Sequence, residues 1–112
     1  MKINAVMDKH VRRAMLFDRY GELLNEKQKK IVEYTVYEDM SLSEIGEAEG
    51  ISRQAASVLL KRADERLEEF EDVLQIIQRS KRINESVAKI RSNSSDPAVI
   101  EELAKIENEL GI

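Results

Sequence analysis

Apolar residues recur at intervals of three and four along most of the chain, which is the periodicity of amphipathic helices. A first stripe ends at Tyr20, before Gly21. A second stripe runs toward Tyr37 and begins after Asn25 and Gln28, which are spaced as a capping box. We expect the two helices to form a hairpin over residues 5–40. Their stripes consist of Met7, Val11, Ala14, Met15 and Phe17, and of Ile31, Val32, Tyr34, Thr35 and Val36.

Residues 41–62, SLSEIGEAEGISRQAASVLLKR, predict two short helices joined by a tight turn. Ser41 with Glu44 is a capping box, in which each side chain binds a backbone N–H at the start of a helix. Gly50 stands where that helix must end, because glycine adopts the left-handed conformation without steric cost. Ser52 is then the N-cap of the second helix. The segment is typical of a helix-turn-helix.

The outer face of the second helix is the candidate nucleic-acid surface, since the first turns of such a helix meet the major groove. Arg53 and Gln54 are placed to pair with guanine or adenine, while Ser57 and Lys61 could contact bases or phosphates. The alternative is that they are ordinary polar residues at a helix start. The candidate binding residues that follow from this position are Arg53, Gln54, Ser57 and Lys61. The residues expected to be buried are Ile45, Ile51, Ala56 and Leu59 or Leu60.

The apolar pattern of this helix continues well past the motif, without glycine or proline. We expect a long helix that is buried on two sides near residues 73–77. Either the chain turns back near Arg79–Arg82, or one long helix pairs with another subunit, and we favour self-association. The first seam is Ala56, Leu60, Ala63, Leu67, Phe70, Leu74 and Ile77. The second is Val73, Ile76, Ser80, Ile83, Val87 and Ile90.

The sequence SNSSDP predicts a linker at residues 92–96. Asp96 as N-cap and Pro97 at the first helical position begin a last helix, which ends at Gly111 and packs on the long one. The whole chain is thus expected to be a single all-α domain over residues 1–112, a helical bundle with a C-terminal extension from residue 63.

Composition narrows the classes of protein. The chain has no cysteine, no apolar run near the about 20 residues that span a membrane, and a charged N-terminus where a signal peptide is apolar. We therefore expect a cytoplasmic protein without membrane insertion. The carboxylates are scattered and His10 has no neighbouring nucleophile or ligand set, so we expect no enzyme, no metal site and no cofactor. Methionines and aromatic residues on the apolar stripes are expected in the core.

The formal charge of −4 is unevenly distributed. Residues 1–62 carry 11 basic and 10 acidic side chains, whereas residues 63–112 carry 7 basic and 12 acidic ones. Because neutralised phosphates supply most non-specific affinity, this balance predicts weak, salt-sensitive nucleic-acid binding. The acidic half is equally suited to a basic protein partner.

Residues Arg12–Leu74 resemble the YlxM family of small bacterial helix-turn-helix proteins, which are similar to region four of sigma factors. The segments that carry the resemblance are LLNEKQ, SLSEIGEAEGISRQA and LEEFE. The resemblance implies a regulatory role linked to the signal recognition particle pathway, without catalysis. Carried over by position, the resemblance implies a nucleic-acid face of Ser52, Arg53, Gln54, Ser57 and Lys61. One hypothesis is a protein that binds DNA or the RNA of that particle, in which Lys61 and Arg62 anchor phosphates. The other is an adaptor that docks on the particle's GTPase or its receptor through acidic C-terminal helices. A homodimer would suit either.

Overall fold

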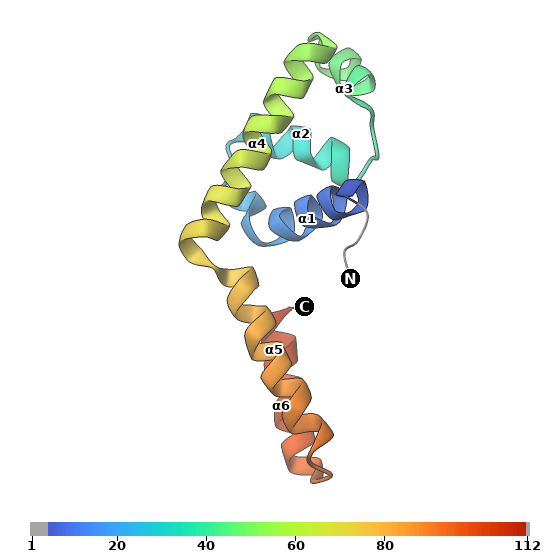
Figure 1. The fold of residues 1–112 in the computed structure, drawn as a ribbon. Coiled ribbons are helices and arrows are strands. Elements are labelled where there is room, and N and C mark those ends of the chain that lie inside the picture. The colour runs from blue at the N-terminus through green and yellow to red at the C-terminus, as the bar shows by residue number, and fades with distance from the viewer. Residues whose placement is uncertain (1–4, 112) are drawn as a thin grey trace. The chain divides into compact units, whose positions relative to one another are not determined.

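A computed structural model of the chain describes residues 5–111, with side chains from Lys9 onward (Figure 1). This part is all-α, as expected, and contains no strand. None of its helices is long and apolar enough to cross a membrane. The predicted stripe position Met7 lies outside the described side chains.

The elements are α1 (Ala5–Tyr20), a 3-10 turn η1 (Gly21–Leu23), α2 (Glu26–Val36), α3 (Leu42–Glu49), α4 (Arg53–Leu74), α5 (Ile76–Ser92) and α6 (Pro97–Leu110).

The chain divides into two compact units, one up to Leu74 and one from Gln75 onward. The expected start of the C-terminal extension, residue 63, falls inside α4. In the first unit α4 contacts α1, α2 and α3 (Figure 1). The aliphatic and aromatic side chains between these helices form one core. Its buried members are Leu16, Phe17, Tyr20, Leu24, Ile31, Val32, Ile45, Ala56, Ala63 and Leu67.

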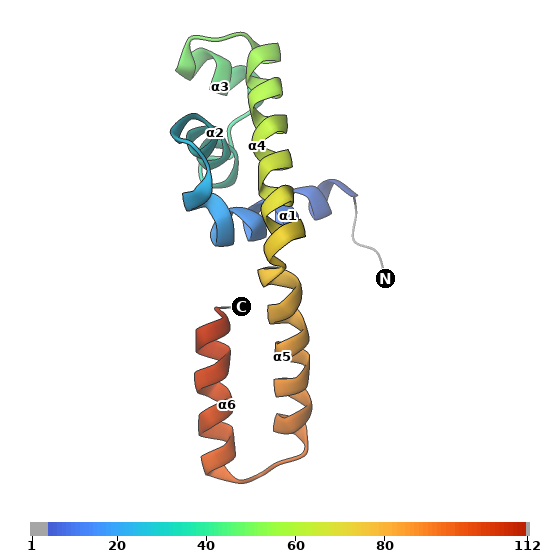
Figure 2. The same ribbon diagram turned by 90° about the vertical axis from the view of Figure 1, so that its left-hand side faces the viewer.

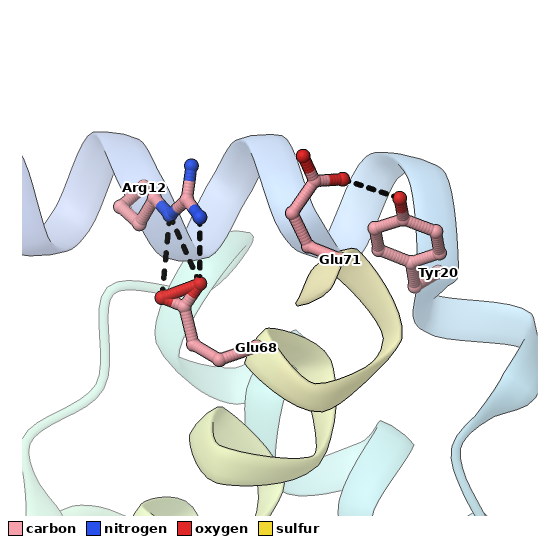
Figure 3. Close-up of polar contacts among 4 residues, drawn as sticks. All are labelled: Arg12, Tyr20, Glu68 and Glu71. Atoms are coloured by element: carbon pink, nitrogen blue, oxygen red, sulfur yellow. Dashed lines mark hydrogen bonds and ion pairs between the residues drawn. The ribbon is translucent and has the colours of Figure 1, made fainter. Parts of the chain in front are cut away.

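Polar contacts join α1 to the second half of α4 (Figure 3). Arg12 Nη2 lies 2.7 Å from Glu68 Oε1, and its Nε donates to the same carboxylate. One turn earlier on α4, Asp64 accepts two hydrogen bonds from Arg13, at 2.8 and 2.7 Å. The hydrogen bond to Glu68 raises the pKa of Arg12. Two-pronged pairs of this kind fix the register of two helices as well as their proximity.

The long helix expected from the heptad pattern is interrupted at Gln75. This residue has φ 54° and ψ 30°, so α4 ends at Leu74 and α5 begins at Ile76. The expected burial on two sides near residues 73–77 was wrong, because Val73 is 79% exposed and Leu74 42%. A turn near Arg79–Arg82 was also wrong, because α5 is helical throughout that stretch.

The second unit is a pair of helices, α5 and α6, joined by residues 93–96 (Figure 2). As predicted, Asp96 caps α6 by accepting a hydrogen bond from the Ala98 N–H at 2.9 Å, with Pro97 at the first helical position. Gly111 ends the helix at φ 67°. The two helices contact each other side by side, so the last helix packs on α5, the second part of the expected long helix.

Candidate nucleic-acid interface

The first helix of the helix-turn-helix, α3, has the ends that its sequence predicts. Ser41 Oγ accepts from the Glu44 N–H at 3.1 Å, and Glu44 Oε1 accepts from the Ser41 N–H at 2.9 Å. The hydrogen bond from the Ser41 backbone lowers the pKa of Glu44, because it stabilises the carboxylate. Gly50 has φ 69° and ends the helix in the left-handed conformation. The turn is therefore defined by local chemistry on both sides.

Gly46 sets how closely α3 approaches the turn, a role that sequence reasoning missed. The Ile51 N–H donates to the Gly46 carbonyl at 2.9 Å. A Cβ built on Gly46 would lie 2.7 Å from the Ile51 carbonyl oxygen, a distance that real Cβ atoms do not show. A glycine in the middle of a short helix is unfavourable by itself. Its presence at position 46 was therefore the sequence signal that could have indicated a close backbone approach.

Glu49, the last residue of α3, ties the motif to α2. Its Oε2 accepts from the Tyr34 hydroxyl at 2.8 Å and lies 3.2 Å from Lys30 Nζ. The hydrogen bond from Tyr34, followed by the one from Lys30, lowers the pKa of Glu49, and the same contacts raise the pKa of both partners. The cluster holds α3 against the hairpin formed by α1 and α2.

The recognition-type helix, α4, begins as expected. Ser52 Oγ accepts from the Ala55 N–H at 3.0 Å, which is the geometry of an N-cap. On the inner side Ile45 and Ala56 are fully buried, whereas Ile51 and both leucines of the expected core, Leu59 and Leu60, are only half-buried. This packing turns the opposite side of α4 outward.

All six candidate residues are exposed. Three of them, Arg53, Ser57 and Lys61, follow each other at intervals of four and so lie on one side of the helix. Within the described part of the chain, Arg53, Lys61 and Arg62 form no ion pair. Arg53 and Lys61 on this side of α4, and Arg62 roughly 100° further around the helix from Lys61, are therefore available to an anionic ligand. Binding by these six residues stays a prediction.

The surface changes sign directly after this segment. The next three turns of α4 carry a row of acidic residues that lines a shallow groove beside Lys9 and Lys61. Arg12 and Arg13 neutralise two of them, and Arg66 pairs with Glu69. A phosphate backbone would be repelled here, which restricts an interface to the first ten residues of α4. The acidic row is Asp64, Glu65, Glu68, Glu69 and Asp72.

The described carboxylates and His10 form no cluster that could hold a metal ion. His10 lies exposed on α1. It lines a shallow hollow with Ala14, Thr35, Val36 and Asp39, in which the Thr35 hydroxyl donates a hydrogen bond to the Ile31 carbonyl at 3.1 Å. The exposed basic groups on α4 can bind an anion.

Comparisons with known proteins agree with the presence of a helix-turn-helix. A UPF0122 protein of Thermoanaerobacter sp. (strain X514) is 39% identical over 108 residues, which cover 88% of this chain and 92% of the relative. One from Halalkalibacterium halodurans is 36% identical over 98 residues, covering 88% and 90%. No solved structure matches the chain significantly. The family model described as "Putative helix-turn-helix protein, YlxM / p13 like" matches residues 7–106, and the chain belongs to this family.

Proposed function

We propose that the protein binds nucleic acid through the outer face of α4, in a binding role without a catalytic step. The observation that carries the proposal is the set of three exposed cations without ion-pair partners in the described chain, Arg53, Lys61 and Arg62, on the second helix of a helix-turn-helix. Ser52 and Gln54 flank Arg53 at the helix start. Arginine and glutamine are the side chains that pair with guanine and adenine in two-pronged contacts.

Duplex DNA fits this surface better than duplex RNA. The major groove of B-form DNA admits an α-helix, whereas that of A-form RNA is too deep and narrow for side chains to read. The first turn of α4 would then approach base edges through Arg53 and Gln54, and Lys61 and Arg62 would contact phosphates. The RNA of the signal recognition particle, to which the family resemblance points, is the second ligand to test.

Binding is tested by fluorescence anisotropy with two labelled probes, a mixed-sequence 30-base-pair duplex and the particle's RNA, over a series of salt concentrations. The slope of log affinity against log salt is about −0.9 for each phosphate contact on B-form DNA. Arg53→Ala should weaken binding about 10-fold, which corresponds to about 1.4 kcal/mol and the loss of one base contact. Lys61→Ala should reduce the slope by about one contact.

Lys81→Ala is the matched control, because Lys81 is an exposed cation on α5, outside the first unit. It removes the same charge and should leave affinity and slope unchanged. An equal loss in Arg53→Ala and Lys81→Ala would mean that overall charge, not this surface, governs binding. Absence of binding to both probes at about 50 mM salt and micromolar protein would overturn the proposal.

The adaptor hypothesis relied on acidic C-terminal helices, but in the second unit only one of the two helices is mainly acidic. Four of the six acidic residues of the second unit lie on α6, which carries one basic side chain, whereas α5 carries five basic side chains and one acidic one. Docking on the particle's GTPase or receptor would thus rely on α6. Reversal of two exposed charges, Glu101→Lys with Glu102→Lys, should abolish capture of the purified GTPase; unchanged capture would remove the hypothesis.

A further inference from the structure

The second unit buries little by itself. Its buried side chains in the described chain are Ile77, Ser80, Val87 and Leu103, one of which is a serine. An ion pair between Arg91 and Glu107 adds a polar link at the surface of the helix pair. Two short helices with so few buried apolar side chains are marginal in water, since most helix stability comes from packing an amphipathic face.

The same pair exposes apolar side chains in a regular pattern. On α5, Ile83 and Ile90 are seven residues apart and 46% and 48% exposed, and Ile76, seven residues earlier, is 40% exposed. On α6, Ile106 is 41% exposed and Val99, again seven residues away, is half-buried. Seven-residue spacing keeps side chains on one side of a helix, which is the pattern of a packing seam.

Helix geometry puts both stripes on one side of the pair. At 100° per residue the stripe on α5 lies roughly 70° before the centre of the face that carries Ile77, Ser80 and Val87, and the stripe on α6 lies roughly 50° before Leu103. Because α5 and α6 run antiparallel (Figure 2), offsets in the same sense point to the same side of the pair. The pair therefore has one open apolar face, formed by Ile83, Ile90 and Ile106 with Ile76 and Val99.

The charges that border this face suit a second copy of the same chain. Arg79, Arg82 and Lys89 lie along the outer edge of the stripe on α5, on the side away from α6. Glu102 and Glu109 lie along the outer edge of the stripe on α6, on the side away from α5. All five are exposed. Opposite signs on two helices of one molecule become complementary when α5 of one copy lies on α6 of the other.

We propose that the open apolar face of α5 and α6 is the interface of a homodimer, in which the two helix pairs form an antiparallel four-helix bundle with α5 of each copy packed on α6 of its partner. The two-fold axis then runs parallel to the helices, since a perpendicular axis would bring the basic helices together. This symmetry places equal heights of the two helix pairs side by side.

The register follows from the loop. Arg79 lies 13 residues before Ser92, the last residue of α5, and Glu109 lies 12 residues after Pro97, the first of α6. These two side chains consequently meet at nearly the same height. Lys89 and Glu102 form the corresponding pair near the loop.

The size of the face sets the expected strength. A helix of 17 residues is about 25 Å long and two helices are about 20 Å wide, so the face covers roughly 500 Å² per copy. About 1,000 Å² in total is the lower limit of specific interfaces. The dimer should therefore dissociate in the micromolar range.

The test is sedimentation equilibrium of the full chain between about 2 and 200 µM, with circular dichroism to check folding. The wild type should shift from monomer to dimer over this range. Ile83→Glu should remain monomeric with unchanged helix content, because a charge would be buried at the seam. Ala88→Glu is the matched control: Ala88 is exposed on the opposite side of α5, and this variant should dimerise like the wild type.

A charge exchange tests the arrangement. Arg79→Glu should weaken the dimer about 5-fold, and adding Glu109→Arg should restore it. A wild type that stays monomeric at 200 µM would overturn the proposal. If Ile83→Glu also lowers the melting temperature of that monomer, the apolar face is covered within the chain and not by a second copy. Persistence of the dimer in Ile83→Glu, or no restoration by Glu109→Arg, would also overturn it.

Discussion

The Tyr20 hydroxyl donates a hydrogen bond to the Glu71 carboxylate, which fastens the last residue of α1 to α4 (Figure 3). Both residues are buried, with 1% and 6% of their surface exposed. The Tyr20 ring also packs against Phe70, with ring centroids 6.0 Å apart. A buried carboxyl group needs hydrogen-bond partners, and Tyr20 supplies one of them to Glu71 on the inner face of α4.

Tyr20→Phe should lower the free energy of unfolding by about 2 kcal/mol, because it removes a hydrogen bond to a buried charged acceptor while keeping the aromatic packing. Urea denaturation monitored by circular dichroism measures the change. Tyr37→Phe is the control: Tyr37 is 67% exposed, and the loss of its hydroxyl should change stability by less than about 0.5 kcal/mol. Equal effects of both variants would show that the buried hydrogen bond contributes little.

Gly46→Ala should destabilise the first unit by about 1–3 kcal/mol, as expected for an added methyl group in a packed site. The added Cβ meets the Ile51 carbonyl, part of the backbone, at 2.7 Å, so α3 or the turn must move. Nucleic-acid affinity should fall as well, because the turn positions the first residues of α4. Chemical denaturation and anisotropy measure the two effects.

Gly50→Ala separates clash from backbone strain. A Cβ at Gly50 meets nothing within 4 Å, but φ is 69°. The cost should therefore be about 1 kcal/mol, from the left-handed conformation alone. Gly50→Ala costing more than Gly46→Ala would contradict the close approach described for Gly46.

The ends of the helices were predictable from the sequence because they depend on neighbouring residues. The capping box at Ser41, the left-handed Gly50 and the Asp96 N-cap followed by Pro97 each involve groups within four residues of one another. The exposed surface of α4 was predictable for the same reason. The N-cap at Ser52 fixes where the helix begins, and the buried residue Ala56 fixes which side faces inward, so the opposite side faces outward.

Contacts between distant residues were not predictable in this way. Asp64 and Glu68 read as solvated charges, and only the fold shows that Arg13 and Arg12, more than 50 positions earlier, bind them. The break at Gln75 left no sequence signal either, because the apolar spacing continues across it. A non-glycine residue in the left-handed conformation costs only about 1–2 kcal/mol, which packing elsewhere can outweigh.

Gln75→Gly should stabilise the protein by up to about 1 kcal/mol, since glycine adopts φ 54° without strain. Lys81→Gly, in the middle of α5, should have the opposite sign and destabilise by about 1 kcal/mol. Thermal unfolding of the two variants beside the wild type measures both. A lower melting temperature for Gln75→Gly would mean that α4 and α5 do not break at this residue in solution.

Acid should weaken the attachment of α3. The pKa values of Glu44 and Glu49 are lowered in the folded chain, so their contribution to stability is present above the ordinary value of 4.5 and is lost as pH falls through the lower folded values. Glu49→Gln should flatten the dependence of the unfolding free energy on pH below about 4.5. Urea denaturation between pH 3 and 7 measures the slope; an unchanged slope would contradict the contacts with Tyr34 and Lys30.

The acidic row on α4 should limit nucleic-acid affinity. Glu65 is exposed, forms no ion pair in the described chain and lies one turn after Lys61. Glu65→Gln removes a charge that repels a bound phosphate backbone, so DNA affinity should rise about 2- to 5-fold at low salt and less at high salt, where the repulsion is screened. Anisotropy titrations at two salt concentrations measure the difference.

The control is Glu101→Gln, which removes one exposed charge from α6 and should leave the DNA affinity unchanged. If Glu65→Gln also has no effect, the bound nucleic acid does not pass along this part of α4, and contact with the first turns alone would account for binding.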